Sequence, residues 1–81
     1  MNDVEYLETI LKGIVTFPEE IKVEKTLDSK GVLLSLTISK NDMGRVIGKE
    51  GATAKAIRTL MHTYGYNVQA SIFVKILEPV N

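Results

Sequence analysis

Apolar residues recur at intervals of three and four positions near the start of the chain, which is the spacing of one helix face. This stripe consists of Val4, Leu7, Leu11 and Ile14. Just before it, Asn2 and Glu5 stand at the spacing of a capping box. We predict a helix over residues 3–15 that ends before Pro18, with Gly13 as a weak position inside it.

Two segments of alternating apolar and polar residues follow, and such alternation is typical of a half-buried β-strand. They cover residues 21–28 and 32–39. The second segment places on one face Leu34, Leu36 and Ile38. Residues 29–31 form a short turn, in which Gly31 can supply a positive φ. We therefore predict an antiparallel hairpin.

The middle of the chain carries two further helical signals. Residues 40–47 are too few for a full helix but suffice for one turn, capped by Asn41 or Asp42. From Gly51 onwards the helical spacing returns, and Gly65 stands where a C-cap glycine is preferred. The stripe of this helix is Ala54, Ile57, Met61 and Tyr64.

Residues 67–79 alternate with great regularity, which predicts a long strand with one buried face. The inward side chains are Val68, Ala70, Ile72, Val74 and Ile76. Phe73 falls on the opposite, otherwise polar face. It is either a partly exposed hydrophobic residue or part of a contact surface.

The order α-β-β-α-α-β predicts an α+β fold in which residues 1–81 form a single domain. A helical crossover follows the hairpin, and because such crossovers are right-handed, the last strand should lie parallel to the second. Only one face of each strand is apolar. Three helices must therefore cover one face of a three-stranded mixed sheet.

The composition is that of an ordinary globular protein, with 44% hydrophobic and 25% charged residues. The chain has no cysteine, which excludes disulfides and thiolate metal sites. Its apolar stretches are far shorter than a membrane span, and its first ten residues are acidic where a signal peptide is basic. We expect a cytoplasmic protein that does not associate with membranes.

The net charge of zero conceals a separation of charge along the chain. Residues 40–62 carry a net charge of +3, and the remainder carries −3. A neutral chain with one basic segment indicates a local anion site rather than general coating of nucleic acid. The alternative is an ordinary solvated face.

Within the basic segment, the run GRVIGKEGATAKAIR holds three glycines in eight positions. A P-loop is excluded because the glycine spacing is one residue short and Glu50 replaces the magnesium-binding hydroxyl. A dinucleotide fingerprint is excluded because the spacing differs and no βαβ unit surrounds the run. A helical corner whose glycines, Gly44 in particular, only allow close packing stays open as an alternative.

A nucleic-acid groove explains more of the run. Residues 48–51 form a tight turn between two helices, and the free N–H groups of the second helix point towards it. An extended phosphate backbone can lie on this turn, with Lys49 as a point charge. Beside it, Val46, Ile47 and Ala54 supply an apolar floor for the bases.

The run resembles the I-G-x-x-G core of KH domains, whose loop holds the backbone of about four nucleotides. The helix and strand ahead of it resemble the type II arrangement, and the whole chain is similar to the small single-KH RNA-binding proteins of bacteria, the KhpA family. The resemblance rests on G-R-V-I-G-K-x-G-x-x-x-K-A-I-R-T, which is far more specific than G-x-x-G alone. It implies binding of single-stranded RNA, with RNA-chaperone or post-transcriptional roles linked to cell elongation and division.

Carried over by position, the resemblance makes Gly48 and Gly51 the loop glycines and Lys49 the loop cation. The full set of expected RNA-binding residues is Gly44, Arg45, Val46, Ile47, Gly48, Lys49, Glu50, Gly51, Ala54, Lys55 and Arg58. Two residues depart from the family's pattern. Ala52 stands where arginine is common, and Glu50 adds an acid to the loop, so both lower the local positive potential.

The resemblance also implies self-association and pairing with a larger Jag-type KH protein. On a helical wheel, Leu60 falls beside Thr53 at the edge of the apolar stripe, and we expect a homodimer interface there. The alternative function is a protein-interaction module that uses the KH fold mainly for dimerisation.

The remaining polar and aromatic residues do not assemble a catalytic set. His62 is the single histidine and lies late in a helix, so we expect no enzymatic activity, no cofactor and no metal site. The tyrosines, which we expect to pack rather than to stack on bases, are Tyr6, Tyr64 and Tyr66.

Overall fold

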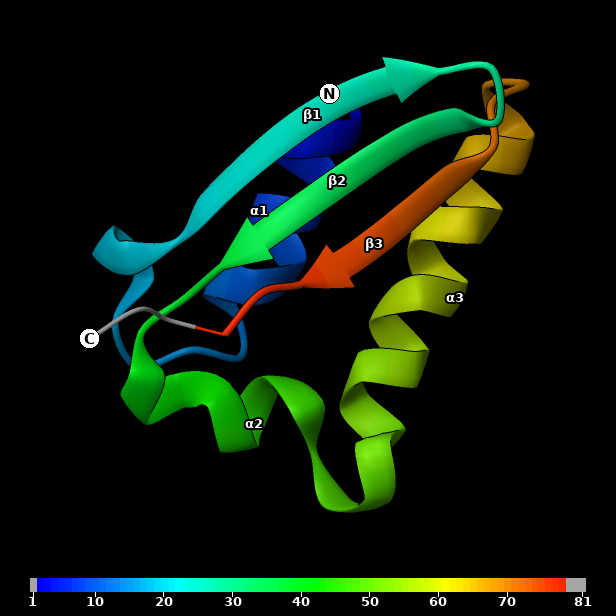
Figure 1. Ribbon diagram of the computed structural model, residues 1–81. Helices are drawn as coiled ribbons and strands as arrows, with labels where there is room; N and C mark the ends of the chain where they lie inside the picture. The colour runs from blue at the N-terminus through cyan, green and yellow to red at the C-terminus, as the bar shows by residue number, and fades with distance from the viewer. Residues whose placement is uncertain (1, 79–81) are drawn as a thin grey trace.

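A three-stranded sheet forms one layer of the protein and three helices form the other (Figure 1). The computed structural model describes residues 2–78. Its elements are α1 (Asp3–Lys12), η1 (Pro18–Glu20), β1 (Lys22–Asp28), β2 (Gly31–Thr37), η2 (Lys40–Asp42), α2 (Met43–Ile47), η3 (Lys49–Gly51), α3 (Ala52–Asn67) and β3 (Ile72–Ile76). The predicted α-β-β-α-α-β order is confirmed, with short 3₁₀ turns (the η elements) between some of the larger elements.

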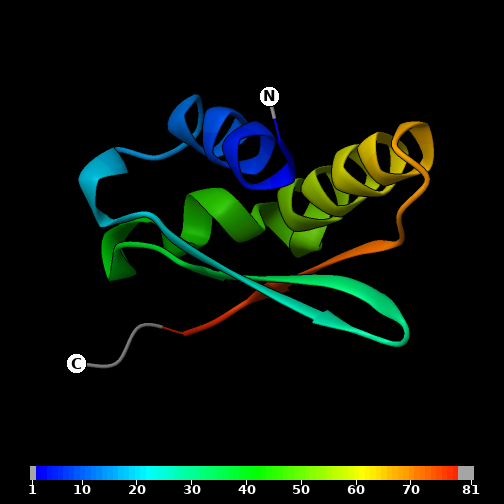
Figure 2. The same ribbon diagram turned by 90° about the horizontal axis from the view of Figure 1, so that it is seen from above.

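Strand β2 is central in the sheet and pairs with both other strands. It runs antiparallel to β1, where Leu36 lies opposite Val23, and parallel to β3, where Leu34 lies opposite Val74. All three helices cover the same face (Figure 2). The α+β class and the mixed sheet are therefore as predicted, and β3 forms the sheet edge that packs beside α3.

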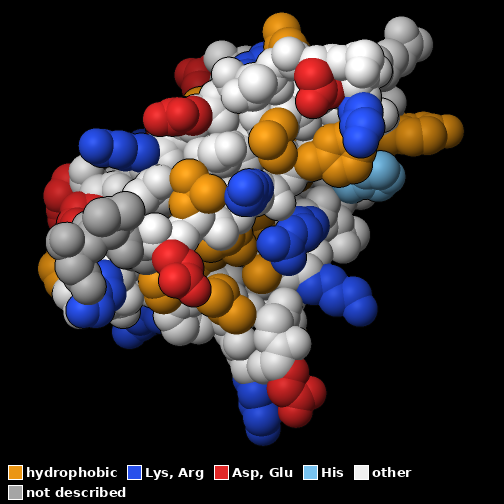
Figure 3. Space-filling model, in the orientation of Figure 1, with side chains coloured by type: hydrophobic (Ala, Val, Ile, Leu, Met, Phe, Trp, Pro, Cys, Tyr) orange, Lys and Arg blue, Asp and Glu red, His pale blue; other side chains and the backbone are white. Residues whose placement is uncertain are grey.

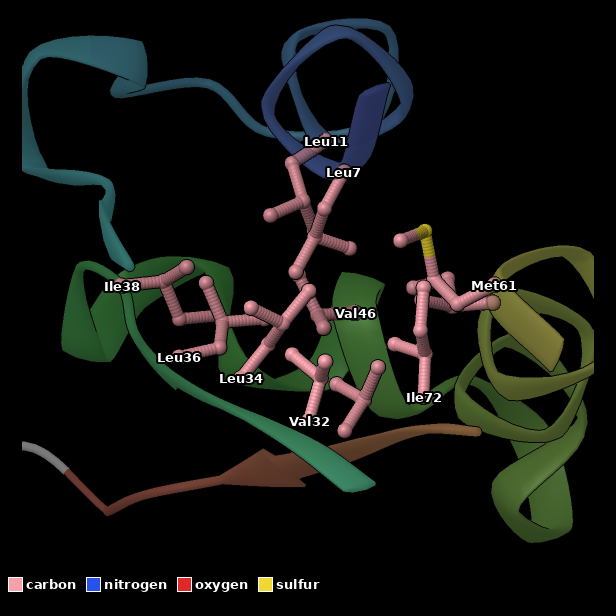
Figure 4. Close-up of a cluster of buried hydrophobic side chains, with 11 residues drawn as sticks. Leu7, Leu11, Val32, Leu34, Leu36, Ile38, Val46, Met61 and Ile72 are labelled. Carbon is pink, nitrogen blue, oxygen red and sulfur yellow. The ribbon is translucent and has the colours of Figure 1, made fainter. Parts of the chain in front are cut away.

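The core lies between the two layers, where the inward side chains of β2 and β3 meet the helix stripes (Figure 4). Its buried residues are Leu7, Leu11, Val32, Leu34, Leu36, Ile38, Val46, Ile57, Met61, Ile72 and Val74. Burying one such aliphatic side chain contributes roughly 1.5–3 kcal/mol. The rings of Tyr6 and Tyr64 stack between α1 and α3 with centroids 4.9 Å apart, as the packing prediction requires, but Tyr66 is exposed and that prediction is wrong for it.

The capping box at the start of α1 is present. The Glu5 backbone N–H donates to Asn2 Oδ1 at 2.8 Å, and the Asn2 N–H donates to Glu5 Oε1 at 3.2 Å. The helix ends at Lys12, three residues earlier than predicted, because Gly13 forms its C-cap. Ile14 and Val15 still pack against the core, which explains their apolar spacing.

Strand β1 is more exposed than its alternation predicts. Val23 is half-buried, whereas Lys25 and Leu27 are exposed. Lys25 occupies an inward position, and its Nζ lies 3.0 Å from Oδ2 of Asp3 at the start of α1. An ion pair therefore joins helix and strand where an apolar contact was expected.

The end of α3 differs from the prediction. Gly65 is not a C-cap but a buried residue inside the helix, which continues to Asn67. A Cβ at Gly65 would lie 2.5 Å from the carbonyl oxygen of Ala70 and 3.1 Å from Cγ1 of Ile72, so the glycine allows the chain to pass close to the helix as it enters β3. Consequently the chain turns later, and β3 begins at Ile72 instead of residue 67; its predicted end at residue 79 lies outside the described residues.

Asp42 does not cap a helix with its side chain as predicted. Ser39 takes that role, since its Oγ accepts from the Asn41 N–H at 3.2 Å. The Asp42 carboxylate is buried, and each of its oxygens accepts a backbone N–H at 2.9 Å, one from Thr16 and one from Phe17. It therefore ties the loop after α1 to the start of α2.

Candidate nucleic-acid interface

The loop between α2 and α3 has a backbone that only its glycines allow. Gly48 has φ 76° and ψ 174°, a region that is essentially restricted to glycine, and a Cβ there would lie 2.8 Å from Cβ of Thr53. Gly51 is left-handed at φ 78° and ψ 11°, with nothing within 4 Å of an added Cβ. Glu50 is left-handed as well, at φ 56°. The loop therefore carries no side chain at either end; its backbone is open at Gly51, whereas Gly48 packs against Thr53.

This loop projects from the body of the protein at the bottom of Figure 1, and Figure 3 shows one basic and one acidic side chain at its tip. Lys49 and Glu50 are both exposed. Helix α3 starts immediately afterwards at Ala52, and no side chain caps its N-terminus. The N–H groups of the first turn and the positive end of the helix dipole thus face the same side as Lys49.

Four exposed cations, which we call the basic strip, extend from α2 through the loop along α3. They are Arg45, Lys49, Lys55 and Arg58. Figure 3 shows Lys and Arg side chains among hydrophobic patches on this side of the molecule. The guanidinium of Arg58 is held in place, because its Nε donates to the backbone carbonyl of Val74 on β3 at 3.3 Å.

Between α3 and β3 lies an open hollow of about 310 Å³. Its lining residues are Lys55, Arg58, Thr59, His62, Thr63, Ile72 and Phe73. Strand β3 forms one wall of this hollow through Ile72 and Phe73, and none of the residues predicted for the site comes from this strand. The predicted topology contains the signal for it, since a strand that follows the second helix and pairs with β2 must lie at the sheet edge beside that helix.

The apolar floor of the predicted groove needs a correction. Ile47 is 39% exposed and lies on the surface, but Val46 and Ala54 are buried. Helix α2 is short, and its single buried residue, Val46, faces the core, while Ala54 belongs to the inward stripe of α3. These two side chains therefore support the surface from beneath and do not line it.

Gly44 also has a different environment from the one predicted. A Cβ at this position would meet no atom within 4 Å, so the glycine does not serve the close approach of two helices. It is exposed on α2, next to Arg45 of the basic strip.

Across residues 2–78, no group of three or more His, Cys, Asp or Glu side chains is placed to hold a metal ion. In the same residues, none of the helices combines the length and the apolar character needed to cross a membrane. His62, the one histidine, lies in the hollow between α3 and β3.

A four-residue glycine loop between two helices, placed beside the edge of an α-β-β-α-α-β mixed sheet, defines a KH domain of type II. The family model described as KhpA/KhpB, KH domain, matches residues 4–76. The chain belongs to this family, and the predicted family is confirmed.

Several curated relatives are similar along most of their length. The chain is 39% identical to "RNA-binding protein KhpA" of Listeria monocytogenes over 74 residues, 91% of this chain and 97% of the relative. It is 38% identical to the protein of that name from Clostridium perfringens over 73 residues, 90% and 97% of the two chains. For Chlamydia trachomatis the identity is 36% over 74 residues, 91% and 95%.

Proposed function

We propose that this protein binds single-stranded RNA along a path from the glycine loop to the hollow between α3 and β3. The observation that carries the proposal is the loop itself, where both glycines allow the tight turn and Gly51 leaves the backbone open beside the uncapped N-terminus of α3. Phosphates lie against these N–H groups and the basic strip, and bases lie over Ile47 and towards β3.

Other considerations support RNA as the partner. The relatives carry the name RNA-binding protein. In the hollow, Ile72 and Phe73 of β3 lie across from Lys55 and Arg58 of α3, and Arg58 is bonded to the Val74 carbonyl. Glu50 and Ala52 reduce the positive potential of the loop, so we expect modest affinity and little sequence selectivity. The proposed role is cytoplasmic and non-catalytic, as an RNA chaperone or post-transcriptional regulator linked to cell elongation and division.

The test replaces Lys49 and Glu50 together by aspartate. Both side chains are exposed and both loop glycines stay, so the thermal midpoint should remain close to that of the parent. Binding of a labelled single-stranded RNA should collapse, because two acids then face the phosphates. Lys22→Asp is the matched control, since it makes the same change in net charge on β1 at the opposite edge of the sheet. Equal RNA affinity of the folded double variant and the control would refute the site.

A second candidate function is protein pairing through α3. Leu60 on this helix is 43% exposed, and Thr53, two turns earlier on the same side of the helix, is half-buried. Leu60 therefore presents an apolar side chain on the surface of α3. We propose a two-fold homodimer across this surface, and the larger Jag-type KH protein as an alternative partner for it. Sedimentation at micromolar concentration should show a dimer for the parent and a monomer for Leu60→Asp. A monomeric parent, or a dimeric variant, would exclude this interface.

A further inference from the structure

Phe73 is an aromatic residue whose exposure the core does not explain. It lies on β3 between buried Ile72 and buried Val74, opposite Leu33 of β2. Its side chain is 51% exposed. Leu33 is its neighbour across the strand pair, and Phe73 lines two hollows, one shared with α3 and one shared with the β1–β2 hairpin.

The two hollows differ in charge. The one shared with α3 contains Lys55 and Arg58, and among residues 2–78 no carboxylate side chain lines it. The one shared with the β1–β2 hairpin contains Asp28 beside Lys30. An anionic strand is therefore favoured on the α3 side of the ring.

The hollow also lies on the path of an RNA that starts at the glycine loop. Helix α3 begins at the loop and rises about 15 Å between Ala52 and His62. The hollow follows this stretch of the helix, from Lys55 to Thr63. Lys55 and Arg58 are the lining residues of the hollow that come first along α3 after the loop, and Arg58 is bonded to the carbonyl of Val74. A KH loop holds about four nucleotides. A longer strand that follows α3 from the loop meets the hollow next.

We propose that Phe73 is a stacking platform for the base of a nucleotide just beyond those held at the loop, with Lys55 and Arg58 next to its phosphates. This inference rests on the proposed RNA binding and specifies a further subsite of it. Stacking on an aromatic ring tolerates any base, so the subsite adds affinity and length dependence without sequence preference.

The experiment compares Phe73→Leu with Phe73→Tyr, which keeps a ring that can stack. Phe17→Leu is the matched control, because Phe17 is the other phenylalanine, is also on the surface, and does not line the hollow. Affinities are measured for single-stranded RNAs of four and eight nucleotides, and for eight-nucleotide RNAs with one abasic position moved along the strand. Thermal midpoints are recorded for every variant.

We expect Phe73→Leu to weaken binding of the eight-nucleotide RNA about fivefold or more, from the usual contribution of one stacked base. Binding of the four-nucleotide RNA, and all binding by Phe73→Tyr and Phe17→Leu, should stay at the parent's level. One abasic position should weaken binding by the parent but not by Phe73→Leu. An RNA with 5-iodouracil at that position should crosslink to the peptide containing Phe73.

Other results would overturn the inference in distinguishable ways. If Phe73→Leu lowers only the thermal midpoint and binds every RNA like the parent, the ring serves packing against Leu33. If Phe73→Tyr loses as much affinity as Phe73→Leu, the effect is not stacking. If Phe73→Leu does not fold, absence of the crosslink in the parent decides against the subsite. A parent that binds none of the RNAs would refute the proposed function itself.

Discussion

The two loop glycines should respond differently to alanine, because they need glycine for different reasons. Gly48 has a backbone conformation that side chains almost never adopt, which costs on the order of 1–3 kcal/mol. Its added Cβ would also press on Thr53 at the start of α3, where backbone and side chain are both in the way. Gly51 is left-handed with open space around it, so alanine there costs only roughly 1–2 kcal/mol.

Urea unfolding of the two variants measures this difference. Gly48→Ala should lose more than Gly51→Ala, by about 1 kcal/mol or more, with the same dependence on urea in both cases. Gly44→Ala is the control. Its site lies in α2 with no atom within 4 Å, so alanine should leave stability unchanged or raise it by up to about 1 kcal/mol.

RNA binding by the same variants separates stability from function. Gly51→Ala should remain folded but place a methyl group on the open loop surface where the phosphate backbone approaches, so its RNA affinity should fall severalfold. If Gly51→Ala is as destabilising as Gly48→Ala, the contact with Thr53 has no energetic role. If Gly51→Ala binds RNA like the parent, the backbone of the strand does not approach this glycine.

Further predictions concern charge. Burial raises the pKa of Asp42, but the N–H groups of Thr16 and Phe17, with smaller contributions from the Thr16 side chain and Arg45, bring it below the ordinary 3.8. The parent should therefore gain stability relative to Asp42→Asn above that value and lose the advantage as pH falls below it, as urea unfolding across pH 2–6 can check. If the basic strip neutralises about two to four phosphates, the logarithm of the RNA binding constant should fall against the logarithm of salt with a slope of roughly −1.5 to −3. DNA and RNA of one sequence should bind within about an order of magnitude of each other unless a 2′-hydroxyl is read.

The fold could be predicted because its main determinants are periodic. Leu34 and Leu36 alternate with polar residues, and both are buried on the helix side of β2. Ile57 and Met61 recur at helical spacing and are buried in the same core. Each pattern indicates which face of its own element is covered. The right-handed crossover then allows a single order of the strands in the sheet, β1-β2-β3.

Individual glycines and acids were harder to interpret, because one residue type serves several purposes. Gly65 has the position of a helix terminator, yet the helix continues past it, and its missing side chain makes room for the Ala70 carbonyl and for Ile72. Asp42 has the position of a cap, yet its carboxylate binds two N–H groups from a loop about 25 residues earlier in the chain. The partners of Asp42 lie far away in the sequence and those of Gly65 lie beyond the end of its helix, so the pattern of neither helix contains them.

The candidate site also has one part that a local sequence pattern predicts and one part that depends on tertiary structure. The loop was visible in the sequence because its conformation demands glycine at Gly48 and Gly51, and such demands leave a local signature. The wall formed by β3 has no such local signature and follows only from the predicted topology, and the bond from Arg58 to the Val74 carbonyl involves the backbone of this strand. Phe73 lies between these cases. Its place on a polar face was evident, but only the approach of α3 gives the exposed ring a cationic hollow to line. In the proposed complex the motif therefore identifies where the RNA strand is held, and the tertiary contact between α3 and β3 provides the hollow into which a longer strand extends.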